Sequence, residues 1–141
     1  MAKTTQQLYN DYKYEKNRLL KIKADLEADI SDNEEKVKQL NEYNKKIKKS
    51  NDEIKPLVDK YLTIGDYLKE VRPEGKPMDN GDFITNSENI KKCSTYLSNL
   101  SAEVEKEIER LKSKITKLKS TLRSTNSNIS YYSKLISGLS I

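Results

Sequence analysis

The chain has 141 residues, enough for one domain, but only 34% of them are hydrophobic, 35% are charged and none is Trp. This balance excludes an ordinary compact globule and leaves either a disordered chain or a helical chain with a narrow apolar stripe. The net charge of +5 is uneven, because no acidic residue follows Glu109.

The first half of the chain has the periodicity of a packed helix. From Leu19 to Leu68, apolar residues recur at alternating steps of 3 and 4, with one stutter around Leu26. We call these positions, and their counterparts in the second half, the seam. Three asparagines occupy seam positions: Asn33, Asn44 and Asn51. They are candidates for fixing register and partner choice, the alternative being that they lie at water-accessible edges.

Pro56 interrupts the helical pattern of the first half. Proline removes one helix hydrogen bond and clashes with the preceding turn, so we expect a kink or a short break near residues 52–56. If the chain folds back around residue 79, Pro56 lies near Ala102, inside a stutter of the second half.

Residues 72–83, RPEGKPMDNGDF, separate the two halves. Pro73 ends the first helix, and the two glycines suit turns. The stretch lacks the GxxxxGK[ST] frame of a phosphate loop, and DNGD lacks the alternating oxygen ligands of a calcium loop. We therefore expect a turn at 72–85, with no catalytic, cofactor-binding or metal site.

The second half repeats the seam from Ile90 to Leu139, with one stutter around Val104. The segment TNSE at 85–88 fits a capping box, whereas Asp79 or Asp82 offers an earlier helix start. Cys93, the sole cysteine, falls on this seam, where we expect it to act as a small hydrophobe.

These patterns predict an all-α fold, an elongated antiparallel helical hairpin of two coiled-coil-like helices. We expect a single domain over 1–141, with a first helix at about 5–71, a turn at 72–85 and a second helix at about 86–138. The carboxylates lie on exposed helix faces, and the chain has no His. No enzymatic activity and no cofactor are therefore expected.

A two-helix hairpin is marginally stable alone and commonly joins a larger bundle. Two surfaces are candidates for contact with a partner, an apolar stripe beside the turn and a serine ridge near the C-terminus. The stripe comprises Leu57, Tyr61, Ile64, Leu68, Val71, Met78 and Phe83, and the ridge comprises Ser130, Ser133 and Ser137. The alternatives are that the turn folds over the stripe, and that the ridge is a frayed polar tail.

Other partners are less favoured by the sequence. The basic segment after Glu109 has few aromatic residues for base stacking, which argues against nucleic acid. No apolar run approaches the length of a membrane span, and the N-terminus has no signal-peptide core. We expect a cytoplasmic protein without membrane insertion, whose export, if it occurs, accompanies a partner and needs no cleaved signal peptide.

The turn and its flanks resemble a known family. EGKPMDNGDF at 74–83, followed by SENIKKCSTYLSNL, resembles the inter-helical region of small helical-hairpin proteins encoded beside LXG toxins. These proteins belong to type VII secretion systems of low-GC Gram-positive bacteria and are relatives of the WXG-type hairpins. The chain departs from the WXG class, since EGKPMDNG stands in place of Trp-x-Gly.

The resemblance implies an accessory or targeting protein, chaperone-like, that binds the helical N-terminal region of a secreted toxin, alone or with a second small hairpin. Two other classes stay open: a self-pairing, homodimeric coiled-coil protein of a phage or other assembly, and a basic helical protein associated with nucleic acid.

Overall fold

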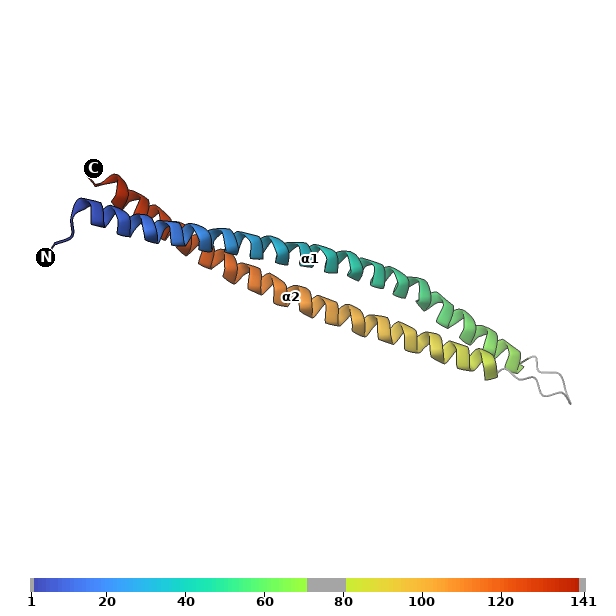
Figure 1. The fold of residues 1–141 in the computed structure, drawn as a ribbon. Coiled ribbons are helices and arrows are strands. Elements are labelled where there is room, and N and C mark those ends of the chain that lie inside the picture. Colours follow the sequence, from blue (N-terminus) through green and yellow to red (C-terminus); the bar gives the residue numbers. More distant parts are fainter. Residues whose placement is uncertain (1, 71–80, 140–141) are drawn as a thin grey trace. The chain divides into compact units, whose positions relative to one another are not determined.

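The protein is described by a computed structural model over residues 2–70 and 81–139, with side chains described at 2–64 and 88–139. It contains two α-helices, α1 (Thr5–Glu70) and α2 (Gly81–Ser137), shown in Figure 1. The helices pack against each other as an all-α helical hairpin, which confirms the fold class that the seam predicts.

A capping box fixes the start of α1. The Gln7 N–H donates to Thr4 Oγ1 at 3.2 Å, and the Thr4 N–H donates to Gln7 Oε1 at 2.9 Å. This reciprocal pair satisfies two backbone amides that the helix itself leaves unpaired. The helix therefore begins at Thr5, at the expected position.

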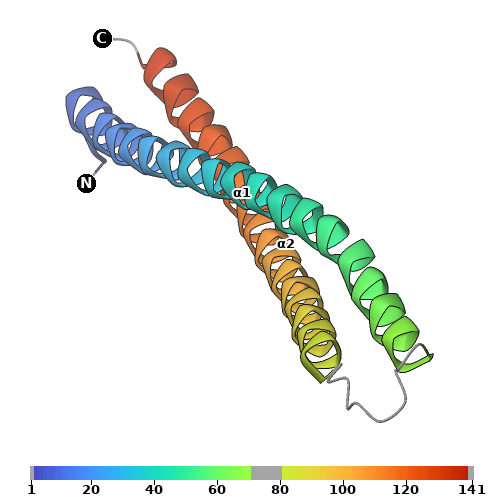
Figure 2. The ribbon, with the colours of Figure 1, turned by 90° about the vertical axis from the view of Figure 1, so that its right-hand side faces the viewer.

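Helix α1 is continuous through Pro56. Figure 2 shows it as one uninterrupted ribbon from its blue end to its green end. The expected short break is therefore wrong, while the kink stays a prediction. Proline costs about 3 kcal/mol inside a helix. The half-buried seam residues Ile54 and Val58 on either side continue the packing that offsets this cost.

The bounds of α2 differ from the expected ones at its N-terminal end. The helix begins at Gly81, so residues 81–85 are helical and the expected turn is five residues too long there. The segment TNSE lies inside the helix and does not cap it, and the alternative of an earlier start is correct. At the other end the Gly138 N–H bonds the Lys134 carbonyl at 3.0 Å, one residue beyond the last helical residue.

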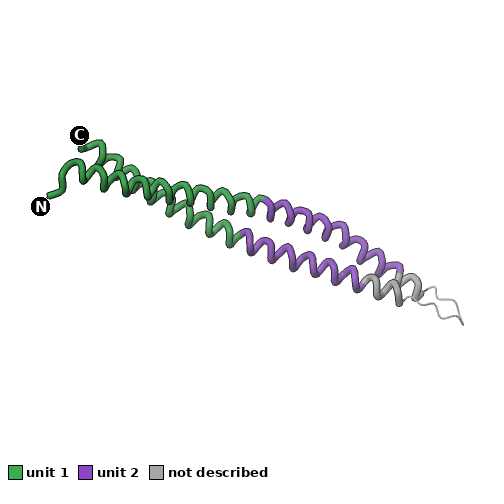
Figure 3. Tube along the Cα trace, viewed as in Figure 1, with its two compact units in different colours: residues 1–38, 109–141 green, residues 39–108 purple. Residues whose placement is uncertain are grey.

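The hairpin divides into two compact units, coloured in Figure 3. Unit 1 comprises Met1–Lys38 and Glu109–Ile141, and unit 2 comprises Gln39–Ile108. Each unit contains one stretch of α1 and one stretch of α2, which run antiparallel. This division does not test the expectation of a single domain over residues 1–141, which stays a prediction.

Unit 1 has an apolar core on the seam. Among its described residues the buried apolar side chains are Leu19, Ile30, Leu111 and Ile115. Near the chain ends the rings of Tyr12 and Tyr132 meet, with centroids 6.1 Å apart. These residues come from the two stretches at seam or near-seam positions, so the heptad pattern correctly predicts which faces meet.

Unit 2 has a more polar core. Among its described side chains Ile108 is the buried apolar residue, while the buried polar residues are Asn44, Asn51 and Ser101. Cys93 is exposed, which contradicts its expected place on the seam. The neighbouring Ser94 is half-buried and hydrogen-bonded to Asn51, so the contact face of α2 includes position 94 instead of 93.

The register of the hairpin also differs from the expected one. Lys55 and Val58 line one hollow together with Lys91 and Thr95. Pro56 therefore lies across from residues 91–95, and its expected position near Ala102 is wrong. The expected centre of the pairing between the helices, residue 79, is therefore too far along the chain.

Candidate partner-binding surfaces

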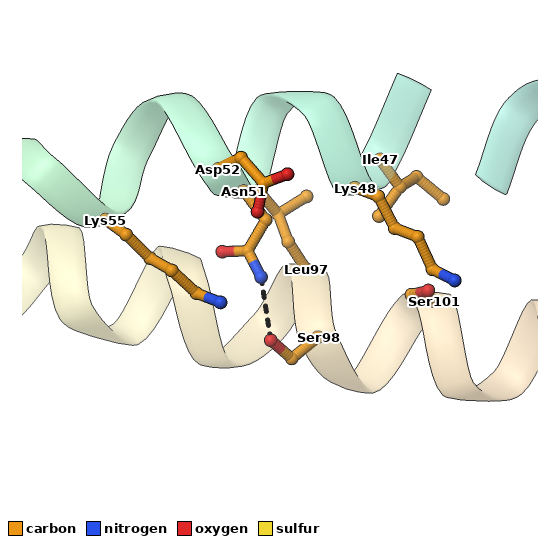
Figure 4. Close-up of a pocket in the computed structure, with 8 residues that line it drawn as sticks. All are labelled: Ile47, Lys48, Asn51, Asp52, Lys55, Leu97, Ser98 and Ser101. Atoms are coloured by element: carbon orange, nitrogen blue, oxygen red, sulfur yellow. Dashed lines mark hydrogen bonds between the residues drawn. The ribbon is translucent and has the colours of Figure 1, made fainter. Parts of the chain in front are cut away.

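Two asparagines of α1 bond serines of α2 in unit 2. The Ser101 hydroxyl donates to Asn44 Oδ1 at 2.6 Å, and the Ser94 hydroxyl donates to Asn51 Oδ1 at 2.6 Å. The Asn51 amide in turn donates to the Ser98 hydroxyl at 2.9 Å, as Figure 4 shows. We call this set the Asn–Ser ladder. Because each buried acceptor has a partner, the ladder favours one register between the helices.

An ion pair borders the Asn–Ser ladder on the surface. Lys48 Nζ lies 2.8 Å from Glu105 Oε1, and the Asn44 amide donates to the same oxygen at 3.3 Å. The hydrogen bond from Lys48, then the one from Asn44, lowers the pKa of the Glu105 carboxyl. The pair is exposed, so its role is to orient side chains more than to stabilise the fold.

A shallow hollow of about 270 Å³ lies beside the ladder (Figure 4). Its lining comes from both helices and consists of Ile47, Lys48, Asn51, Asp52, Lys55, Leu97, Ser98 and Ser101. Two of the lining residues, Ser98 and Ser101, have short side chains that fill little of the space between the helices. The hollow offers hydrogen bonding and packing. Among the described residues no group of three His, Cys, Asp or Glu side chains is placed to hold a metal ion.

The predicted apolar stripe is partly described. Leu57 is 44% exposed, and Tyr61 and Ile64 are half-buried. Leu62, between them, is 45% exposed. The side chains of the remaining stripe residues lie outside the described part of the chain: Leu68, Val71, Met78 and Phe83. The described part of the stripe thus leaves apolar surface open to a partner.

The predicted serine ridge lies in unit 1. Ser133 is half-buried, whereas Ser130 and Ser137 are exposed. The ridge is helical up to Ser137, which contradicts the alternative of a frayed tail over most of its length. Contact of the ridge with a partner stays a prediction.

Some surface features were missed by sequence reasoning. Several aromatic side chains are largely exposed although they lie away from the predicted stripe: Tyr14, Tyr43, Tyr96 and Tyr131. The serines of the ladder were missed too, although Ser94, Ser98 and Ser101 recur at steps of 4 and 3 on one face of α2. A row of serines on one helix and asparagines on the seam of the other form a sequence pattern that indicates hydrogen bonds between the two helices.

Neither helix, over its described residues, combines the length and apolarity that a bilayer crossing requires. Comparison with known proteins finds no matching family model, no matching curated protein and no matching solved structure.

Proposed function

We propose that this chain is a non-enzymatic binding protein, an accessory or targeting factor that pairs with the helical N-terminal region of a type VII secreted toxin. The partner class comes from the resemblance of residues 74–100 to the hairpins encoded beside LXG toxins. The chain pairs with its partner through exposed helix faces, as helices do in larger bundles.

The incomplete burial of the seam is the observation that supports this proposal. Many apolar seam residues are only half-buried by the second helix of the hairpin, among them Leu26, Val37, Leu40, Ile54, Val58, Leu97, Val104, Leu118 and Ile129. A further helix against the hairpin would remove this surface from water, at about 25 cal/mol for each Å² of apolar surface.

Co-purification tests the proposal. The full chain, tagged, is expressed together with the helical N-terminal region of an LXG-type toxin encoded beside it, and the mass of the product is measured by light scattering. We expect a complex of defined stoichiometry. The variant L57S/L62S/I64S should weaken it at least tenfold, because it removes the exposed apolar surface of the stripe.

A matched variant separates binding from folding. K60S/T63S changes exposed polar residues of the same stretch and should leave the complex intact. A chain that forms no complex and instead yields a stable dimer would support the self-pairing coiled-coil class and defeat the proposal.

A further inference from the structure

The two units differ in charge. Unit 1 carries 15 basic and 9 acidic residues, whereas unit 2 carries 12 basic and 13 acidic residues. The surplus in unit 1 comes from α2, where residues 110–134 include 7 basic residues and no acidic one. A surplus of this size attracts an anionic partner if it gathers on one side of the unit.

One ion pair defines the two sides of unit 1. Glu34 Oε1 lies 3.3 Å from Lys119 Nζ, so these two residues lie on the same side of the helix pair. Residues two positions apart on a helix do not share a face. Asp32 and Lys117 therefore belong to the opposite side.

The opposite side carries a smaller surplus of basic residues. Steps of 3 and 4 along the helices from Asp32 and Lys117 reach four acidic and six basic residues there: Arg18, Lys21, Asp25, Asp29, Asp32, Glu35, Lys36, Arg110, Lys114 and Lys117. The carboxylates of this side offset most of its cations, so it attracts an anionic partner weakly.

The side of Glu34 and Lys119 is basic. Steps of 3, 4 and 7 along the helices lead from this pair to five further residues, which together with Lys119 we call the basic flank: Lys13, Lys16, Leu20, Lys23, Lys119 and Arg123. Its acidic neighbours already have partners. Glu27 pairs with Lys23 at 3.9 Å, and Glu34 pairs with Lys119.

The basic flank combines free charge with exposed apolar surface. Lys16 and Arg123 form no ion pair within the described part of the chain, while Leu20 is 40% exposed. Lys13 Nζ lies 5.5 Å from the centre of the Tyr9 ring and covers that ring. An exposed apolar side chain one turn from an unpaired cation matches a helix that presents an apolar residue one turn from a carboxylate.

We infer that the basic flank docks an acidic amphipathic helix of a partner protein. The inference rests on the proposed function and names the chemistry of the partner helix. Partner carboxylates pair with Lys16 and Arg123, and an apolar partner side chain covers Leu20. A second copy of the chain is a poor occupant, because two basic flanks repel each other. Duplex DNA is also a poor occupant, because its phosphate backbone has no apolar side chain to cover Leu20.

A designed peptide tests the docking without the toxin. The probe is a fluorescein-labelled, four-heptad helix with leucine at the a and d positions and glutamate at most others. Anisotropy measures its affinity for the full chain at low and at physiological salt. We expect binding that weakens as salt rises, and at least tenfold weaker binding to K119E/R123E.

The control carries the same charge change on the same helix. K114E/K117E reverses two lysines of the opposite side and should keep the affinity within about threefold, since local pairs dominate over net charge at physiological salt. Circular dichroism of both variants confirms that they fold. A third variant, L20S, should weaken binding without changing its salt dependence.

Three outcomes overturn the inference. The first is equal weakening by the two charge reversals, which indicates attraction by net charge alone. The second is equal affinity for the same peptide with lysine in place of glutamate. The third is tighter binding of a DNA duplex that K119E/R123E abolishes. Because the peptide replaces the toxin, these results leave the proposed function standing, and loss of the toxin complex leaves the inference standing.

Discussion

Over the described side chains, unit 1 buries four apolar residues between α1 and α2, whereas unit 2 buries one and places the Asn–Ser ladder beside it. Apolar contacts are non-directional and tolerate a shift of register. Hydrogen bonds between buried groups are directional, and a shift leaves them unmade. Unit 1 thus contributes more strength, and unit 2 contributes more specificity of alignment.

The buried asparagines also differ between the two units. In unit 2 the oxygens of Asn44 and Asn51 accept bonds from serines of the facing helix. In unit 1 the Asn33 amide bonds only Asp29 of its own helix, and its Oδ1 is buried with no partner among the described residues. One residue type therefore aligns the helices in one unit and is a local defect in the other.

The largest expected effect is on the apolar core. Leu111→Ala in unit 1 should lower the free energy of unfolding by about 2–5 kcal/mol, because Leu111 is 3% exposed and the substitution leaves a cavity. Urea unfolding followed by circular dichroism measures the change. The control Leu62→Ala, at a largely exposed position, should change it by well under half as much.

The next effect concerns the ladder. Asn44→Ala should cost about 1–3 kcal/mol, since the buried Ser101 hydroxyl loses its acceptor. The double variant N44A/S101A should lose less than the sum of the two single variants. Additive losses in this cycle would show that the bond contributes nothing to unit 2.

In unit 1, replacing a buried asparagine should change stability in the opposite direction. Asn33→Leu should leave stability unchanged or raise it by about 1 kcal/mol, because it replaces an unpaired buried oxygen by apolar atoms of similar size. The same urea titration measures it. A loss of stability would mean that Asn33 has a partner that the geometry does not reveal, and the contrast between the units would fail.

The smallest effect is the pH dependence of unit 2. The pKa of Glu105 is lowered in the folded chain, so its contribution is complete above the ordinary value of 4.5 and is lost as pH falls through the lowered value. Glu105→Gln should therefore lower Tm slightly at neutral pH and reduce the loss of Tm on acidification by about the same amount. An unchanged acid slope would contradict this.

The sequence predicts the faces of the helices better than their alignment. Leu19, Ile30 and Leu111 are buried where the heptads place them, because periodicity depends only on local spacing. The register depends on where the chain folds back, and the expected centre at residue 79 would put Asn51 opposite residue 107 instead of Ser94 and Ser98. The turn residues and the capping motif at 85–88 misplace the centre of the pairing, because α2 already begins at Gly81.

The same contrast applies to the candidate surfaces: features of one helix were predictable, and features that depend on both helices were not. Leu57 was predicted as exposed apolar surface, since it lies off the seam of its own helix. The ladder and the basic flank depend on which residues of α2 lie beside which residues of α1. That relation is a property of the paired helices and is not contained in either periodicity alone.

The exposed position of Cys93 has a covalent consequence. The chain has one cysteine, and its thiol faces outward, one residue from the ladder. Any disulfide it forms must join two molecules. In an oxidising compartment the thiol would tether unit 2 to another protein, so measurements of oligomeric state depend on the redox conditions. The same thiol accepts a single fluorophore, which would report on unit 2 without a second labelled site.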